Sequence, residues 1–216
     1  MSRVIEEGSQ LESNTISIYR SAATMAGGRR FSFGALVVVG DRNGKVALGY
    51  AKANEVPPAI EKAQKVGKRA MKRVHLQGGT IPHAVIGRFG SSQVQLLPAS
   101  PGTGVVAGST VRAVLELAGI TDIMTKSYGS NNSKNLAKAV MNGLEQLRPK
   151  EYFGELRGVE IGATEVDERI ARGEAFLKKV EPAKKGDDEP KADSEQGASD
   201  AQPASEASGS DEKTND

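Results

Sequence analysis

The residues best suited to chemistry are two glycines and two arginines in a row, Gly27, Gly28, Arg29 and Arg30. A residue without a side chain lets a phosphate approach the main chain closely. Arginine grips phosphate through two parallel hydrogen bonds, whereas lysine acts as a point charge. The order of these four residues therefore predicts a place where the chain holds the backbone of a nucleic acid.

Two aromatic residues follow, Phe31 and Phe33. Because they are two apart on a predicted strand, both side chains point to the same face. Aromatic rings on such a face can stack on unpaired bases. The chain has only five phenylalanines, so we expect these two to belong to the hydrophobic core and keep base stacking as the alternative.

A second glycine-rich segment, residues 102–108, resembles the dinucleotide-binding pattern G-x-G-x-x-A, with Asp122 about 20 residues after it. The context is wrong for such a site, because Pro98 and Pro101 precede it and no Gly-Lys-Ser/Thr sequence is present. We expect instead the start of a helix whose backbone packs closely against a partner.

Residues for catalysis or metal binding are scarce. His75 and His83 are the only histidines, and the chain has no cysteine. Acid–base catalysis and zinc binding depend largely on these residue types, and no H-E-x-x-H spacing occurs. We therefore expect no catalytic residue, no metal site and no cofactor. His83 lies among apolar residues of a predicted strand, where a histidine is more often structural.

The net charge of +2 conceals an uneven distribution. Residues 181–216 hold 11 acidic and 4 basic residues, which gives −7. Residues 20–73 hold 12 basic and 3 acidic residues, which gives +9. Positive charge concentrated in this way predicts a polyanionic partner.

The elements that must position these residues begin with three strands. Ile16 and Ile18 share one face of a strand at residues 14–19, a longer strand covers residues 29–40, and residues 45–53 return beside it. The Asp-Arg-Asn-Gly sequence at 41–44 predicts the hairpin turn, because Asn-Gly tolerates positive φ. Residues 21–28 are small and predict a flexible loop.

A helix is expected over residues 58–74, since proline fits the first turn. Its apolar face carries Ile60, Ala63, Gly67, Met71 and Val74. Its basic face carries Lys65, Lys68, Arg69 and Lys72. A merely solvated face normally mixes both signs of charge, yet Glu61 is the only acid between Glu55 and Glu116. The basic face therefore favours RNA binding over an ordinary surface.

Residues 75–150 predict a small α/β domain, one sheet with two helices. Strands are expected at residues 81–89, 93–97 and 121–128, and helices at 107–118 and 136–147. The first helix should bury Val111, Val114, Leu115 and Ala118. Residues 151–180 predict a partly helical extension, in which a capping box at Thr164 starts a short helix. Residues 1–13 and the acidic tail 181–216 are too polar to offset the entropy of ordering and are expected to be disordered.

No apolar run approaches the roughly 20 residues that a membrane helix needs. The start of the chain lacks the apolar core of a secretory signal. We therefore expect a cytoplasmic protein with no membrane partner.

With these features together, the sequence resembles the bacterial small-subunit ribosomal protein five family over about residues 15–141. Many short blocks in the right order carry the resemblance: Gly27-Gly28-Arg29, Phe31-Ser32-Phe33, Val38-Val39-Gly40-Asp41, Gly49-Tyr50, Lys52-Ala53, Glu55-Val56-Pro57, Pro98-Ala99-Ser100, Gly102-Thr103-Gly104, Arg112-Ala113-Val114-Leu115-Glu116 and Tyr128-Gly129-Ser130.

The resemblance implies an α+β fold with two domains. A double-stranded-RNA-binding-like β-β-β-α domain at residues 14–74 would precede the small two-layer α/β domain at residues 75–150. It further implies a non-catalytic part of the small ribosomal subunit that binds 16S rRNA near the body–head junction. Small-subunit ribosomal proteins four and eight would be neighbours, and translational accuracy would depend on the protein. Contact with protein four would use Gly102, Gly104 and Arg112.

The expected RNA-binding residues are Arg20, Gly27, Gly28, Arg29, Arg30, Phe31, Phe33, Lys52, Lys65 and Arg69. Family members often carry lysine at the positions of Ala23 and Ala26, so the charge here has moved to the strand start. Two other functions stay open at this point. A small-molecule kinase of the related α/β fold would need hydroxyl groups where Val105 and Val106 stand, and a free double-stranded-RNA-binding regulator would not travel with the ribosome.

Overall fold

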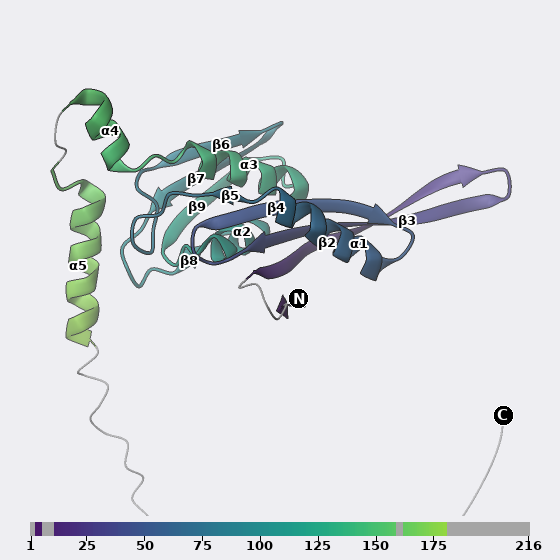
Figure 1. The fold of residues 1–216 in the computed structure, drawn as a ribbon, viewed down its shortest axis with the longest axis horizontal. Helices are drawn as coiled ribbons and strands as arrows, with labels where there is room; N and C mark the ends of the chain where they lie inside the picture. Colours follow the sequence, from purple (N-terminus) through teal and green to yellow (C-terminus); the bar gives the residue numbers. More distant parts are fainter. Residues whose placement is uncertain (1–2, 6–10, 159–161, 181–216) are drawn as a thin grey trace, which may run out of the picture.

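The computed structural model of the protein describes residues 3–5, 11–158 and 162–180. Two sheets with covering helices form an α+β protein, as the sequence predicts (Figure 1). The first sheet is antiparallel, and its neighbours follow chain order: β1 (Arg3–Ile5), β2 (Glu12–Met25), β3 (Gly28–Gly40), β4 (Lys45–Ala53) and β5 (Lys72–Arg73).

The second sheet has the order β6 (Val85–Phe89), β7 (Ser92–Pro98), β9 (Ile123–Gly129) and β8 (Val105–Val106). The strands β8 and β9 are parallel, and the other neighbours are antiparallel. Helices α2 (Ser109–Ala118) and α3 (Ser133–Gln146) bury apolar faces in the same core as this sheet. The predicted inner face of α2, from Val111 to Ala118, is buried.

The turn between β3 and β4 forms where the sequence predicts it. The side-chain Oδ1 of Asp41 accepts hydrogen bonds from the backbone N–H groups of Asn43, at 2.8 Å, and Lys45, at 2.9 Å. Positive φ falls on Arg42 (57°) and Gly44 (89°), which flank Asn43. One carboxylate thus satisfies two donors of the turn, and Lys45 begins the returning strand.

Helix α1 (Val56–Arg69) lies against β3 and β4 because small residues line its inner face. Ala63 and Gly67 are buried as predicted. A Cβ added to Gly49 on β4 would lie only 2.0 Å from the carbonyl oxygen of Ala63. Glycine at this position of the strand therefore allows the helix backbone to approach the sheet.

The helix ends earlier than we predicted. Lys72 and Arg73 form β5 against Val46 and Lys45, and the backbone N–H of Val74 donates to the carbonyl oxygen of Gly44 at 2.7 Å. Pairing with the free edge of β4 satisfies these backbone groups better than a further helical turn would. Met71 and Val74 consequently lie outside the helix.

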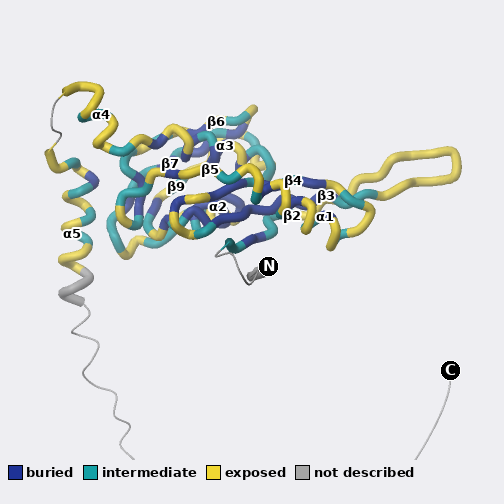
Figure 2. The backbone as a smooth tube through the Cα atoms, in the orientation of Figure 1, coloured by how far each residue is buried: buried dark blue, intermediate teal, exposed yellow. Residues whose placement is uncertain are grey.

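Strand β3 separates two hydrophobic clusters. Alternate residues Val37 and Val39 pack with α1 in the smaller cluster. Leu36 and Val38, on the other face, pack with Leu115 and the rest of the larger cluster, which also holds the core of the second sheet. The two predicted domains therefore share a core across β3 (Figure 2).

The N-terminal segment differs from expectation. Strand β1 and the start of β2 at Glu12 lie within residues 1–13, which we expected to be disordered. The disorder prediction is wrong for these strand residues, because pairing along the edge of β2 orders them. Residues 1–2 and 6–10, and the predicted disordered tail at 181–216, lie outside the described residues.

The C-terminal extension contains α4 (Lys150–Arg157) and α5 (Glu165–Val180). Helix α5 begins within the capping box, in which Thr164 donates to the Oδ2 of Asp167 from its backbone N–H (2.9 Å) and its hydroxyl (3.0 Å). Val166 is buried, and a Cβ on Gly173 would lie 2.6 Å from the Cδ of Pro101. These contacts hold α5 on the second domain.

Candidate nucleic-acid interface

The hairpin of β2 and β3 continues far beyond the body of the protein as an arm, which we define as residues 18–31 (Figure 1). All of its residues are exposed (Figure 2). The two strands pair as far as Met25 and Gly28, which leaves Ala26 and Gly27 as the turn. The arm is therefore a two-stranded ribbon held by its own ladder.

This arm replaces the loop that we predicted at residues 21–28. Apart from Met25, residues 21–28 are small or polar, and they show no alternation of apolar and polar side chains. A ribbon with two solvated faces lacks the period-two signal by which strands are recognised. The backbone pairing, which the sequence does not display, is what orders the segment.

One face of the arm gathers four of the expected RNA-binding residues. Arg20 pairs with Phe33, and Thr24 pairs with Arg29. Paired residues of an antiparallel ladder share a face, and so do residues two apart along a strand. Arg20, Arg29, Phe31 and Phe33 consequently lie on the face that α1 covers further along the sheet.

The aromatic residues of this face are not core residues, contrary to our expectation. Phe31 is 42% exposed, Phe33 is half-buried, and neither belongs to a core cluster. The guanidinium carbon of Arg20 lies 3.7 Å from the centre of the Phe31 ring. The hydrophobic core ends at Ala35, so a strand that runs past it carries its aromatic side chains into solvent.

The opposite face holds Arg30 and Lys52. Lys52 of β4 pairs with Gly34, which lies on the same side of β3 as Arg30. Both side chains are exposed. At the tip, Gly27 and Gly28 have nothing within 4 Å of an added Cβ, and Gly28 has φ of 130°. The structure thus places cations on both faces of the arm and bare backbone at its end.

Lys65 and Arg69 lie elsewhere. Both are exposed on α1. Their neighbours Ala63 and Gly67 pack on Gly49 of β4. The arm, by contrast, begins beyond Ala53, at the end of β4. The predicted RNA-binding residues therefore form two groups, one on the arm and one on the last turns of α1.

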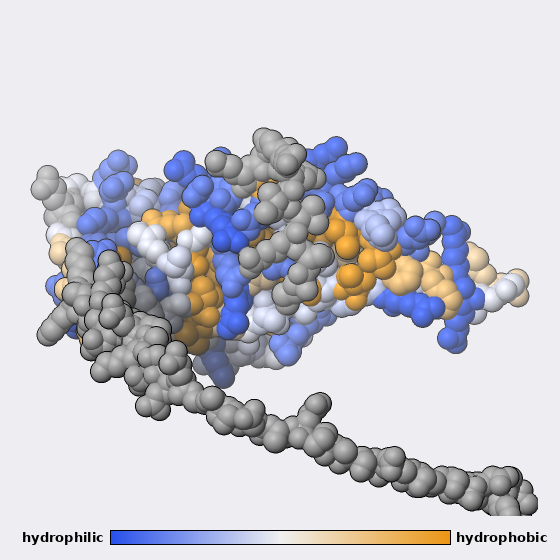
Figure 3. Space-filling view, turned by 90° about the horizontal axis from the view of Figure 1, so that it is seen from below, coloured by the Kyte–Doolittle hydropathy of each residue, from blue (hydrophilic) through white to orange (hydrophobic). Residues whose placement is uncertain are grey.

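The sequence prediction missed three exposed apolar residues of the arm. Ile18, Tyr19 and Met25 are 48%, 37% and 56% exposed. A register shift between Thr15 and Ser17 separates Ile16, which packs on the larger cluster, from Ile18. Figure 3 shows hydrophobic and hydrophilic surface side by side along the arm. A bulge gives no signal in a single sequence, so the prediction that the two isoleucines share a face is wrong.

The glycine loop before α2 uses its donors internally. The backbone N–H of Gly104 donates to the Oδ1 of Asp122 at 3.0 Å, and the hydroxyl of Thr103 donates to the carbonyl oxygen of Ser100 at 2.7 Å. Asp122, which mimicked the ribose-binding acid of a dinucleotide site, therefore braces the loop itself. This geometry argues against a phosphate-binding loop.

The same loop leaves an exposed surface. Gly102 and Gly104 have φ of 89° and 73°, and an added Cβ on Gly104 would meet nothing within 4 Å. Arg112 is exposed on α2, four residues after the helix N-cap Gly108. The predicted protein-contact residues thus lie in one segment. Gly104 is required by its backbone conformation rather than by crowding within the loop.

No helix among the described residues is long and apolar enough to cross a membrane. Over the same residues, histidine and acidic side chains form no group of three that could hold a metal ion.

The chain is similar to known proteins over most of its described residues. A family model described as ribosomal protein S5, N-terminal domain, matches residues 11–75, and one described as ribosomal protein S5, C-terminal domain, matches residues 87–157. Small ribosomal subunit protein uS5 of Thermus thermophilus is 55% identical over 152 residues, 70% of this chain and 94% of the relative. The proteins of the same name from Rhodopirellula baltica and Syntrophobacter fumaroxidans are 54% and 52% identical, over 67% and 72% of this chain and 81% and 95% of theirs.

Proposed function

Because the chain belongs to the ribosomal protein S5 family, we propose that it is a structural constituent of the small ribosomal subunit in the cytoplasm. Its relatives are small-subunit ribosomal proteins rather than enzymes, and we assign it no catalytic activity. In this proposal it binds 16S rRNA near the body–head junction, contacts small-subunit proteins four and eight, and supports translational accuracy.

The observation that carries RNA binding is the arm. Its exposed residues 18–31 include Arg20, Arg29 and Arg30 and no acidic residue. Basic side chains on such a ribbon neutralise phosphates and release counterions. Cations on both faces and bare glycine backbone at the tip suit a ribbon that enters folded RNA and meets phosphates on either side. Lys52 extends this surface at the base of the arm, and Lys65 and Arg69 give a second contact on α1.

Incorporation into the ribosome tests this function. The double variant Arg29→Ala with Arg30→Ala should enter reconstituted small subunits less efficiently than the parent chain and bind 16S rRNA more weakly. Arg172→Ala, which removes an exposed charge from α5, is the control and should behave like the parent. Normal incorporation together with unchanged RNA affinity in the double variant would remove the arm from the proposal.

Contact with protein four is assigned to the segment of Gly102, Gly104 and Arg112. Its support is the exposed, braced loop followed by an exposed arginine. Replacing Gly104 with leucine should weaken that contact and change the frequency of misreading during translation. Unchanged subunit composition and unchanged misreading would contradict this assignment.

The rival functions have separate tests. A kinase would bind ATP, but the N–H of Gly104 is engaged by Asp122 and Val105 begins a strand, so we expect no ATP binding at this loop. A free regulator of double-stranded RNA would remain in the supernatant when ribosomes are sedimented. We expect the protein to travel with the small subunit.

A further inference from the structure

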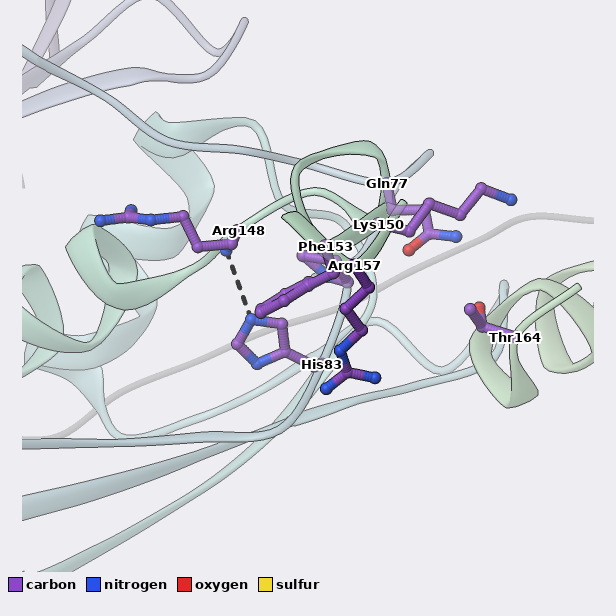
Figure 4. A pocket seen from close by; sticks show the side chains of 8 residues that line it. Gln77, His83, Arg148, Lys150, Phe153, Arg157 and Thr164 are labelled. Atoms are coloured by element: carbon purple, nitrogen blue, oxygen red, sulfur yellow. Dashed lines mark hydrogen bonds between the residues drawn. The ribbon is translucent and has the colours of Figure 1, made fainter. Parts of the chain in front are cut away.

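A pocket lies where the C-terminal extension meets the second domain, at the end of the molecule opposite the arm (Figures 1 and 4). Its cavity volume is about 360 Å³, within the range of small-ligand sites. Gln77 and His83 line it from the segment before β6. The helix α4 contributes Phe153 and Arg157, and Thr164 is the residue just before α5. Thr164, which lies beyond the residues that the family model matches, thus contributes to its wall.

One carboxylate holds this wall in place. Asp167 accepts hydrogen bonds from the Nζ of Lys150 at 3.1 Å, from the backbone N–H and hydroxyl of Thr164, and from the amide of Gln77. These partners come from three separate segments of the chain. Asp167 thus joins the start of α5 to α4 and to the second domain, and its charge is matched by these donors rather than left facing the cavity.

His83 is fixed as a flat wall. Its Nδ1 lies 3.2 Å from the carbonyl oxygen of Ala84, and its Nε2 accepts from the backbone N–H of Arg148 at 3.3 Å (Figure 4). Both ring nitrogens are thus engaged by backbone groups, and neither is left for metal binding. The ring faces remain, and Phe153 adds a second planar group to the lining.

The pocket also contains a cationic side chain. The guanidinium of Arg157 has no hydrogen bond or ion pair to any residue in the described part of the chain, and it lies beside His83 in Figure 4. Among the described residues that line the cavity, none is acidic. Planar walls beside a guanidinium that no described residue pairs with match a ligand that joins a flat ring to an anion.

We propose that this pocket binds a nucleoside phosphate, with the base against Phe153 and His83 and the phosphate on Arg157. Base–aromatic stacking and bidentate arginine–phosphate hydrogen bonds are the interactions that each half of such a ligand needs. The same group could come from a free mononucleotide or from an unpaired nucleotide of an RNA chain. The site is separate from the arm, so it does not depend on the proposed ribosomal contacts.

Binding of AMP and of inorganic phosphate to the full-length chain tests the proposal, with NMR shifts used to locate the ligand. AMP should bind in the pocket more tightly than phosphate. Arg157→Ala should weaken AMP binding by about tenfold, as expected for one charge-assisted contact. Phe153→Leu should weaken AMP by a similar factor, roughly tenfold, and leave phosphate unchanged. The control Arg172→Ala should change neither.

Two further experiments distinguish the possible ligands. A single-stranded oligoadenylate that competes with AMP indicates an RNA nucleotide as ligand, and failure to compete indicates a free mononucleotide; both support a nucleoside phosphate site. Equal binding of phosphate and AMP would overturn the proposal, because the planar walls would then contribute nothing. AMP shifts confined to the arm, or equal displacement of AMP by a glutamate-rich peptide, would also overturn it.

Discussion

The guanidinium of Arg20 covers the ring of Phe31 at 3.7 Å, across the two strands of the arm. Phe31 is the diagonal neighbour of Arg20, since Arg20 itself pairs with Phe33. A cation held over an aromatic face at an exposed site stabilises the pair by about 0.5–1 kcal/mol. The contact orients the arginine before RNA is bound, and a base that stacks on Phe31 must use the open face of the ring.

This geometry predicts that charge and stacking can be separated in the salt dependence of RNA binding. Arg20→Ala should lower the slope of log affinity against log salt concentration by close to one unit, because about one phosphate contact is lost. Phe31→Leu should weaken binding at every salt concentration and leave the slope unchanged. Filter binding with 16S rRNA between low and physiological salt measures both. Equal slopes for Arg20→Ala and the parent would mean that this arginine contacts no phosphate.

Gly104 predicts a stability effect of backbone conformation alone. Alanine at φ of 73° is strained, although its Cβ would meet no atom within 4 Å, so Gly104→Ala should lower the free energy of unfolding by roughly 1 kcal/mol. Gly108→Ala is the matched control, because Gly108 has equal space and φ of −66°. Urea denaturation followed by circular dichroism compares them. An equal loss of unfolding free energy in both variants would contradict an effect of positive φ at Gly104.

The shared core predicts that the two sheets unfold together. A Cβ on Gly40 of β3 would lie 2.2 Å from the carbonyl oxygen of Leu117 on α2. Gly40→Ala should therefore destabilise the protein by about 3 kcal/mol, in one transition that includes both sheets. Gly27→Ala, with open space around it, is the control. Two transitions, with only one of them shifted, would show that the domains are independent.

The docking of α5 should depend on pH only in acid. Hydrogen bonds from the Thr164 backbone and Lys150 lower the pKa of Asp167 from 3.8 to about 2. A lowered pKa in the folded state means that the ionised carboxylate stabilises docking above about pH 4, and that this contribution is lost as the pH falls towards 2. We expect the α5 amides to be protected from hydrogen exchange between pH 7 and pH 5.

Asp167→Asn provides the corresponding test at neutral pH. It removes the charge and keeps the shape, so protection of α5 should fall at pH 7 towards the level of the parent chain in acid. Glu168→Gln, an exposed neighbour on the same turn, is the control. Full protection in the Asp167 variant would mean that Val166 and Gly173 hold the helix without the carboxylate.

The sequence predicted those parts of the fold whose signals are local. Asp41 and the Asn-Gly pair define a turn by their own chemistry, and β4 follows with the predicted bounds. The inner face of α2 follows from helical spacing. Parts that depend on a distant partner were missed: β8 forms because Val105 and Val106 meet β9, and α1 stops because Lys72 and Arg73 pair with β4.

The candidate interface shows the same division. The cationic character of the arm was clear from Arg20, Arg29 and Arg30. The faces on which these residues lie were not, because face assignment requires the register of β2 against β3 and the shift near Ile16. The position of Lys65 and Arg69, away from the arm, follows from the packing of Gly49 on α1. Neither relationship is encoded in neighbouring residues.

The double role of β3 restricts how the length of this protein can vary in evolution. An insertion or deletion of one residue between Gly34 and Gly40 would exchange Leu36 and Val38 with Val37 and Val39 between the two clusters. Both clusters would be disrupted by a single event. At Ala26 and Gly27, by contrast, residues can be added in matched pairs to lengthen the arm without disturbing any buried side chain. Homologues are therefore expected to differ in arm length and to be constant in the spacing from Gly34 to the Asp41 turn.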